Sequence, residues 1–355
     1  MLGKRLKLAR ASAGLSLRDL EARLGNVVSA QAIGKYERDE MMPSSKVLIA
    51  LVDALGVSES YLLGQGVVQL EEVDFRKNAI TSKKEEAQVQ AAVISRIEPY
   101  LDIEEILQTA SLEWDRPREA PYPVRELADA ERAADSLRRH WDLGGNPIPA
   151  LAEFLEERGI KVLCFDLPKS VSGLTCQVRR GSSKNVPVIV INGRDTGERH
   201  RFTLAHELGH LVMDVAPGID EEKAAHRFAG AFLMPAETIW AEIGKRRQSI
   251  SLGELRQLKR LFGASLQAIA YRCKDLGVLG QPTIRRMFTF FECQGWRNPP
   301  YAEPDLMPKE NPERFKRLCF RALAEGAISE AKAAELLGLT VRRLNQEMEE
   351  PPAAV

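Results

Sequence analysis

The chain has 355 residues, of which 44% are hydrophobic and 28% are charged, and this composition is that of a globular protein. Its length exceeds that of a typical single domain and predicts two or three domains. The 50 basic residues balance the 50 acidic residues. A chain without net charge is not drawn as a whole to nucleic acid or to a membrane surface, so any DNA contact must come from a local patch.

Two further features concern the cellular compartment. The first residues lack the long apolar run and cleavage site of a secretion signal, and no run approaches about eighteen consecutive apolar residues. We therefore expect a cytoplasmic protein with no membrane partner. An odd number of cysteines without a C-x-x-C pair disfavours both a disulfide framework and a cysteine-based zinc site: Cys164, Cys176, Cys273, Cys293 and Cys319.

Residues 1–66 predict a small all-helical domain at the head of the chain. Ser16 is a good N-cap for a second helix that Gly25 closes, and Ser29 is a good N-cap for a third helix over 30–37. The segment between Gly25 and Ser29 is a turn, and two short helices joined by such a turn form a helix-turn-helix.

The order of these signals resembles the Xre/Cro-type helix-turn-helix family. The motifs that carry the resemblance are Gly14-Leu-Ser16, Leu20-Glu-Ala-Arg-Leu-Gly25, Ile33-Gly-Lys-Tyr-Glu37 and Tyr61-Leu-Leu63. In that family the third helix enters the major groove of operator DNA, and its first residues contact the bases. The resemblance implies that Gln31 suits adenine and that Lys35 suits guanine or phosphate. The full set of candidate DNA contacts is Ser29, Ala30, Gln31 and Lys35.

The same segment has a second interpretation, as a helical domain used only for protein contact or dimerisation. Residues 1–64 carry nine basic residues against seven acidic residues, a mild excess. Such a weak local charge favours a homodimer as the form that binds DNA.

Residues 67–123 predict a connector between domains. We expect a short strand over 67–75 and a charged helix over 81–98, which Pro99 should kink or end. A proline-rich loop over 114–123 ends the connector. The helix carries an apolar stripe, which either packs within the chain or joins two chains in a dimer: Val89, Val93 and Ile97.

Residues 124–280 predict an α+β domain with a small sheet. Two helices, over 124–140 and 148–158, precede three runs that indicate strands over 160–165, 172–178 and 186–191. The last run contains Pro187, which cannot donate to a ladder and therefore suggests an edge strand. An edge strand directly before the next helix would suit a peptide that adds as a further strand.

That next helix contains His206-Glu-Leu-Gly-His210, the order H-E-x-x-H. Residues four apart lie on one face of a helix, so His206 and His210 can bind one metal ion. Glu207 lies about 100° further round the helix, where it can reach water on that metal without ligating it. An apolar stripe on the other side predicts that the helix is fixed in a core: Leu204, Leu208, Leu211 and Val212.

A catalytic zinc ion usually has three protein ligands and one open position. The candidates for the third ligand are Glu221, Glu222 and His226, which follow shortly downstream. Only Glu222 and His226 share a helix face, so one of them can ligate while the other supports a ligand histidine.

The H-E-x-x-H motif followed by Glu222-Lys-Ala-Ala-His-Arg-Phe-Ala-Gly-Ala-Phe-Leu-Met-Pro235 resembles the ImmA/IrrE family of metallopeptidases, over residues 145–280. The resemblance implies a gluzincin-like domain in which His206, His210 and Glu222 bind Zn2+ and Glu207 is the catalytic base. His226 stands where asparagine or aspartate is more familiar in the family. The third ligand therefore stays open between Glu222 and His226, with Glu222 favoured.

Residues 281–355 predict a helical C-terminal segment with a docking or regulatory role. Within it, residues 328–339 resemble half of a helix-turn-helix, so a second DNA contact is the alternative.

The two resemblances together imply a multidomain DNA-binding transcriptional regulator with a zinc endopeptidase domain. The endopeptidase would cleave a repressor, an antitoxin-like protein or the chain itself in a stress or mobile-element response. Operator DNA and that protein substrate are the expected partners. Two alternatives lack proteolysis: a regulator that uses the peptidase fold as a sensor or dimerisation body, and an antitoxin-like repressor. The intact His206, Glu207 and His210 favour the peptidase.

Overall fold

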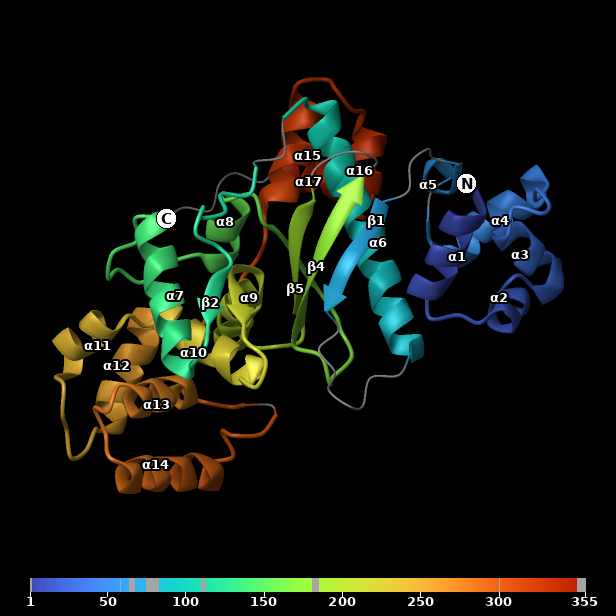
Figure 1. Cartoon of the computed structure of the whole chain (residues 1–355). Helices are drawn as coiled ribbons and strands as arrows, with labels where there is room; N and C mark the ends of the chain where they lie inside the picture. The colour runs from blue at the N-terminus through green and yellow to red at the C-terminus, as the bar shows by residue number, and fades with distance from the viewer. Residues whose placement is uncertain are drawn as a thin grey trace. The chain divides into compact units, whose positions relative to one another are not determined.

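The computed structural model describes residues 2–57, 59–63, 68–74, 83–109, 113–180, 185–299 and 301–349. The chain forms two compact units. The first unit comprises 1–113, 176–186 and 313–355, and the second unit comprises 114–175 and 187–312. Figure 1 labels the helices and strands and colours them along the chain. Among the described residues, no helix is both long enough and apolar enough to span a membrane.

The first unit begins with five short helices around one small core. Ser16 and Ser29 accept the backbone N–H groups of residues 19 and 32, which fixes the starts of the second and third helices. The predicted helix-turn-helix is therefore present. The helices are α1 (Leu2–Ser12), α2 (Leu17–Arg23), α3 (Ala30–Glu37), α4 (Ser45–Leu55) and α5 (Glu59–Leu63). The fully buried core residues are Leu6, Leu20, Ile33, Leu51 and Leu62.

Strand β1 (Val68–Asp74) and the long helix α6 (Lys83–Ile106) follow. Pro99 was predicted to kink or end this helix. It does not end it, because α6 continues to Ile106. Proline inside a helix costs about 3 kcal/mol. Burial of Ile97 and Ile103, one on each side of it, contributes roughly 1.5–3 kcal/mol each, which offsets that cost. The predicted apolar stripe of α6 is buried within the chain, where α6 packs against α1.

The first unit also contains the three helices at the end of the described chain. They are α15 (Arg314–Ala324), α16 (Glu330–Leu337) and α17 (Val341–Glu349). Helix α15 packs on α6 through the rings of Phe315 and Tyr100, whose centroids lie 5.3 Å apart.

The sheet contains β3 (Lys161–Phe165), β4 (Gly173–Arg180) and β5 (Val186–Asn192), in the order β1-β4-β5-β3. Strands β3 and β5 are parallel, with Lys161 opposite Val188. The prediction that Pro187 marks an edge strand is wrong, because β5 has a neighbour on each side. Pro187 is tolerated because it lies one residue before the register with β3 begins. A peptide therefore cannot add as a further strand along β5.

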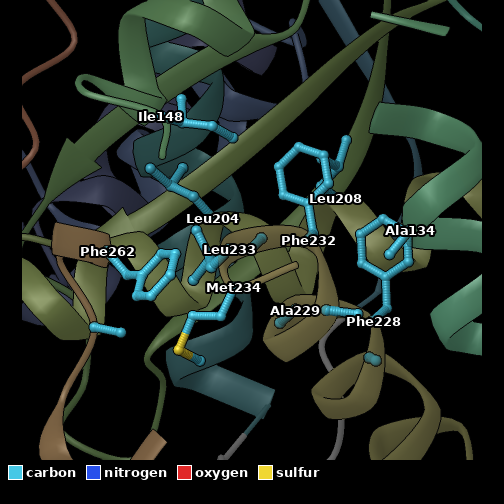
Figure 2. Packing of buried hydrophobic residues seen from close by; sticks show 14 of the residues in the cluster. Ala134, Ile148, Leu204, Leu208, Phe228, Ala229, Phe232, Leu233, Met234 and Phe262 are labelled. Carbon is cyan, nitrogen blue, oxygen red and sulfur yellow. The ribbon is translucent and has the colours of Figure 1, made fainter. Parts of the chain in front are cut away.

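The second unit packs its helices around one large core. Figure 2 shows Leu208 beside Phe232 in this core, and Leu204 near Ile148 and Leu233. Its helices are α7 (Leu127–His140), α8 (Leu151–Glu156), α9 (Gly197–Val212), α10 (Glu221–Leu233), α11 (Ala236–Ile243), α12 (Leu252–Phe262), α13 (Leu266–Asp275) and α14 (Gln281–Cys293). A short parallel pair joins β2 (Tyr122–Val124) to β6 (Met213–Val215). The whole arrangement agrees with the predicted helical head, mixed α/β middle and helical C-terminal segment.

Candidate metal centre and helix-turn-helix surface

Helix α9 is held in the core by the predicted apolar stripe, since Leu204, Leu208 and Val212 are fully buried. Its neighbour α10 approaches closely at Gly209. A Cβ on Gly209 would lie 2.9 Å from Cδ1 of Phe228, a distance that real side chains do not adopt. The glycine inside the H-E-x-x-H motif therefore permits the contact with the helix that carries Glu222.

Three side chains from these two helices converge. Nε2 of His206 and Nε2 of His210 lie 3.0 Å apart. Oε2 of Glu222 lies 3.3 Å from Nε2 of His206, and Oε1 lies 3.9 Å from Nε2 of His210. The side chains of His206 and His210 are 12% and 3% exposed, whereas that of Glu222 is 52% exposed. The cluster is therefore buried on its histidine side and opens towards Glu222.

The spacing of these atoms suits a single metal ion. Zinc binds imidazole nitrogen and carboxylate oxygen at about 2.0–2.2 Å in a tetrahedron, whose neighbouring ligand atoms lie roughly 3.3 Å apart. One ligand atom from each of His206, His210 and Glu222 lies within 4.8 Å of the other two. Two imidazoles and one carboxylate also form the donor set of many catalytic zinc sites. These three residues could therefore hold the ion.

The other two candidates for the third ligand lie beside this cluster. Nδ1 of His226 lies 2.6 Å from the backbone oxygen of Glu222 and must donate to it, because a carbonyl only accepts. The ring of His226 meets the ring of His206 edge to face, with centroids 4.7 Å apart. Oε1 of Glu221 lies 3.6 Å from Nδ1 of His210.

Helix α10 is fixed in position by a network of charged residues on its far side. Arg227 of α10 contacts Glu131 of α7 at 2.6 Å and Asp275 of α13 at 3.0 Å, and the buried Arg272 also contacts Glu131. Burial alone would raise the pKa of Glu131. Hydrogen bonds and charge from Arg272 and Arg227 instead hold that pKa below its ordinary value. The charged form of Glu131 therefore joins three helices of the second unit.

The predicted base, Glu207, is 6% exposed and accepts a hydrogen bond of 2.7 Å from the Thr175 hydroxyl. Thr175 lies on β4, whose start meets α9 closely. A Cβ on Gly173 would lie 2.4 Å from Cγ2 of Thr203 on α9. Sequence reasoning placed a strand here but missed Thr175, because strand periodicity does not reveal which helix the strand will face.

A second feature that the sequence did not reveal is the acidic strap, which we define as residues 303–310. Glu310 forms a buried ion pair of 2.6 Å with Arg201 of α9. Glu303 contacts the fully buried Lys259 of α12 at 3.0 Å, and Glu198 of α9 contacts the same ammonium. The strap therefore anchors both α9 and α12.

The four candidate DNA contacts in the helix-turn-helix differ in how far they are exposed. Gln31 and Lys35 are exposed and lie four residues apart, so they share one face of α3. Ala30 is partly exposed, and the Ser29 hydroxyl caps α3 by accepting from the backbone N–H of residue 32 at 3.2 Å. Glu37 pairs with Arg10 of α1 at 2.5 Å, so its charge is neutralised within the domain.

Comparison with protein families agrees with both halves of this description. Residues 6–62 match the model described as Helix-turn-helix, and residues 155–274 match the model described as IrrE N-terminal-like domain. A search of curated proteins finds no match. The chain is therefore a fusion of an Xre-type helix-turn-helix domain with an IrrE/ImmA-type peptidase domain, which is the architecture of a DNA-binding regulator.

Proposed function

We propose that this regulator carries a zinc-dependent endopeptidase site, with His206, His210 and Glu222 as ligands and Glu207 as the catalytic base. The observation that carries the proposal is the convergence of three ligand atoms within 4.8 Å of one another. A buried carboxylate follows His206 directly in the chain, where H-E-x-x-H chemistry requires a base.

Each residue then has one role in peptide hydrolysis. A zinc ion bound here would polarise the scissile carbonyl and make water acidic enough to act as a nucleophile near neutral pH. Glu207 accepts the proton of the attacking water and delivers it to the leaving amine. The Thr175 hydroxyl donates to Oε2 of Glu207 and so fixes the direction in which this carboxylate points.

The choice of Glu222 over His226 rests on their contacts. Both oxygens of Glu222 face the two imidazole Nε2 atoms, whereas His226 meets His206 ring against ring. We therefore expect Glu222→Ala to lose zinc at a chelator concentration that wild type withstands. His226→Asn should retain zinc, with an affinity lowered at most about 10- to 100-fold, the range for a supporting residue. Zinc loss from His226→Asn alone would reverse the assignment.

The fusion suggests the class of substrate. A peptidase attached to a DNA-binding domain acts where transcription is controlled, so its target is a repressor, an antitoxin-like protein or the chain itself, in a stress or mobile-element response. The DNA partner is an operator contacted by Ser29, Ala30, Gln31 and Lys35 in a cytoplasmic homodimer.

The test combines metal analysis with a cleavage assay. Purified protein is incubated with the products of the adjacent genes, and fragments are identified by mass spectrometry. We expect wild type to contain zinc and to cleave one of these proteins, and Glu207→Gln to contain zinc without cleaving it. Equal cleavage by Glu207→Gln would falsify the role of this base.

A second candidate is a regulator that binds zinc as a sensor without proteolysis. The low exposure of His206, Glu207 and His210 favours it, because a substrate must reach these side chains. In that case wild type and Glu207→Gln would both contain zinc, neither would cleave, and zinc removal would change DNA affinity in both.

A further inference from the structure

Helices α16 and α17 are joined by a turn with well-defined caps at both sides. The Ser329 hydroxyl accepts from the backbone N–H of residue 332 at 3.2 Å and starts α16. Gly338, with φ of 65°, closes α16 in the left-handed conformation that glycine favours. The Thr340 hydroxyl accepts from the backbone N–H of residue 343 at 3.2 Å and starts α17.

A similar order of caps occurs in the helix-turn-helix at the head of the chain, although four positions separate Gly25 from Ser29 there and only two separate Gly338 from Thr340. There Ser16 caps α2, Gly25 follows with φ of 66°, and Ser29 caps α3. Ser16 precedes Gly25 by the same number of positions by which Ser329 precedes Gly338.

The buried positions also correspond. Four residues after the first cap, Leu20 in α2 and Ala333 in α16 are both fully buried. Four residues after the second cap, Ile33 in α3 and Leu344 in α17 are both fully buried. The second helix of each pair therefore packs against its domain through the residue four positions after its cap, and the opposite face of that helix points outwards.

That outward face of α17 is basic at its beginning. Arg342, Arg343 and Gln346 are exposed. The side chain of Arg343 is 56% exposed and also contacts Glu347 at 3.5 Å. The acidic residue nearest to them, Glu347, pairs with Lys316 of α15 at 2.7 Å, which offsets its charge. Two guanidinium groups at a helix N-terminus, where the helix dipole is positive, suit a phosphate backbone.

A turn of this kind is not sufficient to give the second helix an exposed face at its beginning. Helices α12 and α13 are joined by Gly263, with φ of 62°, and Ser265, which caps α13. Helix α13 buries Leu266, Ile269 and Arg272 in the core of the second unit, and its exposed residues all lie in its second half: Tyr271, Lys274 and Asp275. Among these three helix pairs, only α2–α3 and α16–α17 have exposed side chains in the first turn of the second helix.

Helices α1 and α15, which pack beside α3 and α16 respectively, are both fixed to α6 of the first unit. Arg5 of α1 contacts Glu98 of α6 at 3.0 Å, and Arg314 of α15 contacts Glu104 of α6 at 3.1 Å. The first of these ion pairs is buried and the second is partly buried. Glu98 and Glu104 are separated by about 9 Å along the helix axis.

We propose that α15, α16 and α17 form a second helix-turn-helix, which contacts duplex DNA through Arg342, Arg343 and Gln346. The arginines meet phosphates, and Gln346 lies one turn further along the same helix, where it can reach a base edge in the major groove. The proposal does not depend on the peptidase site, since it concerns the first unit alone.

The test measures binding of the full chain to a labelled duplex DNA of mixed sequence, by fluorescence anisotropy over a series of KCl concentrations. Gln31→Ala/Lys35→Ala provides the background, so that the first helix-turn-helix contributes less. Each phosphate contact adds about 0.9 to the slope of log affinity against log salt. We expect Arg342→Ala/Arg343→Ala to reduce that slope by about two and to weaken binding.

Two matched variants complete the experiment. Arg342→Lys/Arg343→Lys keeps both charges and should keep the slope. Arg285→Ala/Arg286→Ala removes two exposed charges from α14 in the second unit and should leave the slope unchanged. The proposal is overturned if the α17 alanine variant keeps the full slope, or if the α14 variant loses as much. A change in oligomeric mass without a change in slope would assign α17 to protein docking and would also overturn it.

Discussion

Replacing Thr175 by valine should remove the hydrogen bond that joins Glu207 to strand β4. The substitution removes the hydroxyl but keeps a β-branched side chain of nearly the same volume, so packing at this buried position changes little. The lost bond is 2.7 Å long and ends on a carboxylate. Hydrogen bonds to charged groups contribute about 1.5–3 kcal/mol. If that energy fixes the base in its working direction, kcat/KM falls by about 10- to 100-fold.

The assay follows cleavage of the substrate protein together with zinc content and thermal unfolding. Zinc content should match wild type, because the Thr175 hydroxyl donates to Glu207, which is the proposed base and not one of the three proposed ligands. Thr175→Ser keeps the hydroxyl and should recover most of the rate. The reasoning fails if the valine variant cleaves at the wild-type rate, or if the serine variant is as slow as the valine variant.

Three further predictions concern packing, pH and thiols. Gly209→Ala should lower the free energy of unfolding by about 1–3 kcal/mol and weaken zinc retention, because its methyl group would force α9 and α10 apart. Gly253→Ala, a helix glycine whose added Cβ meets only ordinary contacts, should instead raise stability by about 0.5–1 kcal/mol in the same denaturation assay. A hydrogen bond from Arg256 is the main cause that lowers the pKa of Asp305 to about 2, so the stability from this pair is present above about pH 4 and lost as pH falls through 2. Carboxyl NMR titration should find a higher Asp305 pKa in Arg256→Ala, and an unchanged value would refute the pairing. Cys293 is exposed, whereas burial raises the pKa of the three buried thiols to about 11 or 12, so a thiol reagent should react fastest with Cys293. Retention of the fast phase in Cys293→Ser would contradict this order.

The parts of the site that follow from local spacing were predictable from the sequence. His206 and His210 share a face of α9 because they are four residues apart, and the caps Ser16 and Ser29 are local signals of the same kind. The approach of Glu222 to that face could be expected only as one of several candidates, since it depends on how α10 packs.

Long-range contacts were not predictable. Thr175 and Glu207 are 32 residues apart, and Glu310 and Arg201 are 109 residues apart, with no periodic signal between them. Local rules also failed where packing outweighed them. Pro99 did not end α6, because burial of its neighbours offsets the lost hydrogen bond. Pro187 did not mark an edge strand, because it lies just before the register with β3 begins, where a backbone donor is dispensable.

The acidic strap limits where the polypeptide can be cut without losing the peptidase fold. A fragment that stops soon after α13 would lack Glu303 and Glu310, and Lys259 and Arg201 would lose these carboxylate partners inside the core. Removing one partner of a buried ion pair costs about 3–5 kcal/mol. Glu198 remains beside Lys259, so this cost applies in full at Arg201, and that loss alone is a large part of the stability of an ordinary domain, about 5–15 kcal/mol. A soluble minimal peptidase should therefore extend through Pro312, and shorter fragments should be degraded or recovered as aggregates during expression.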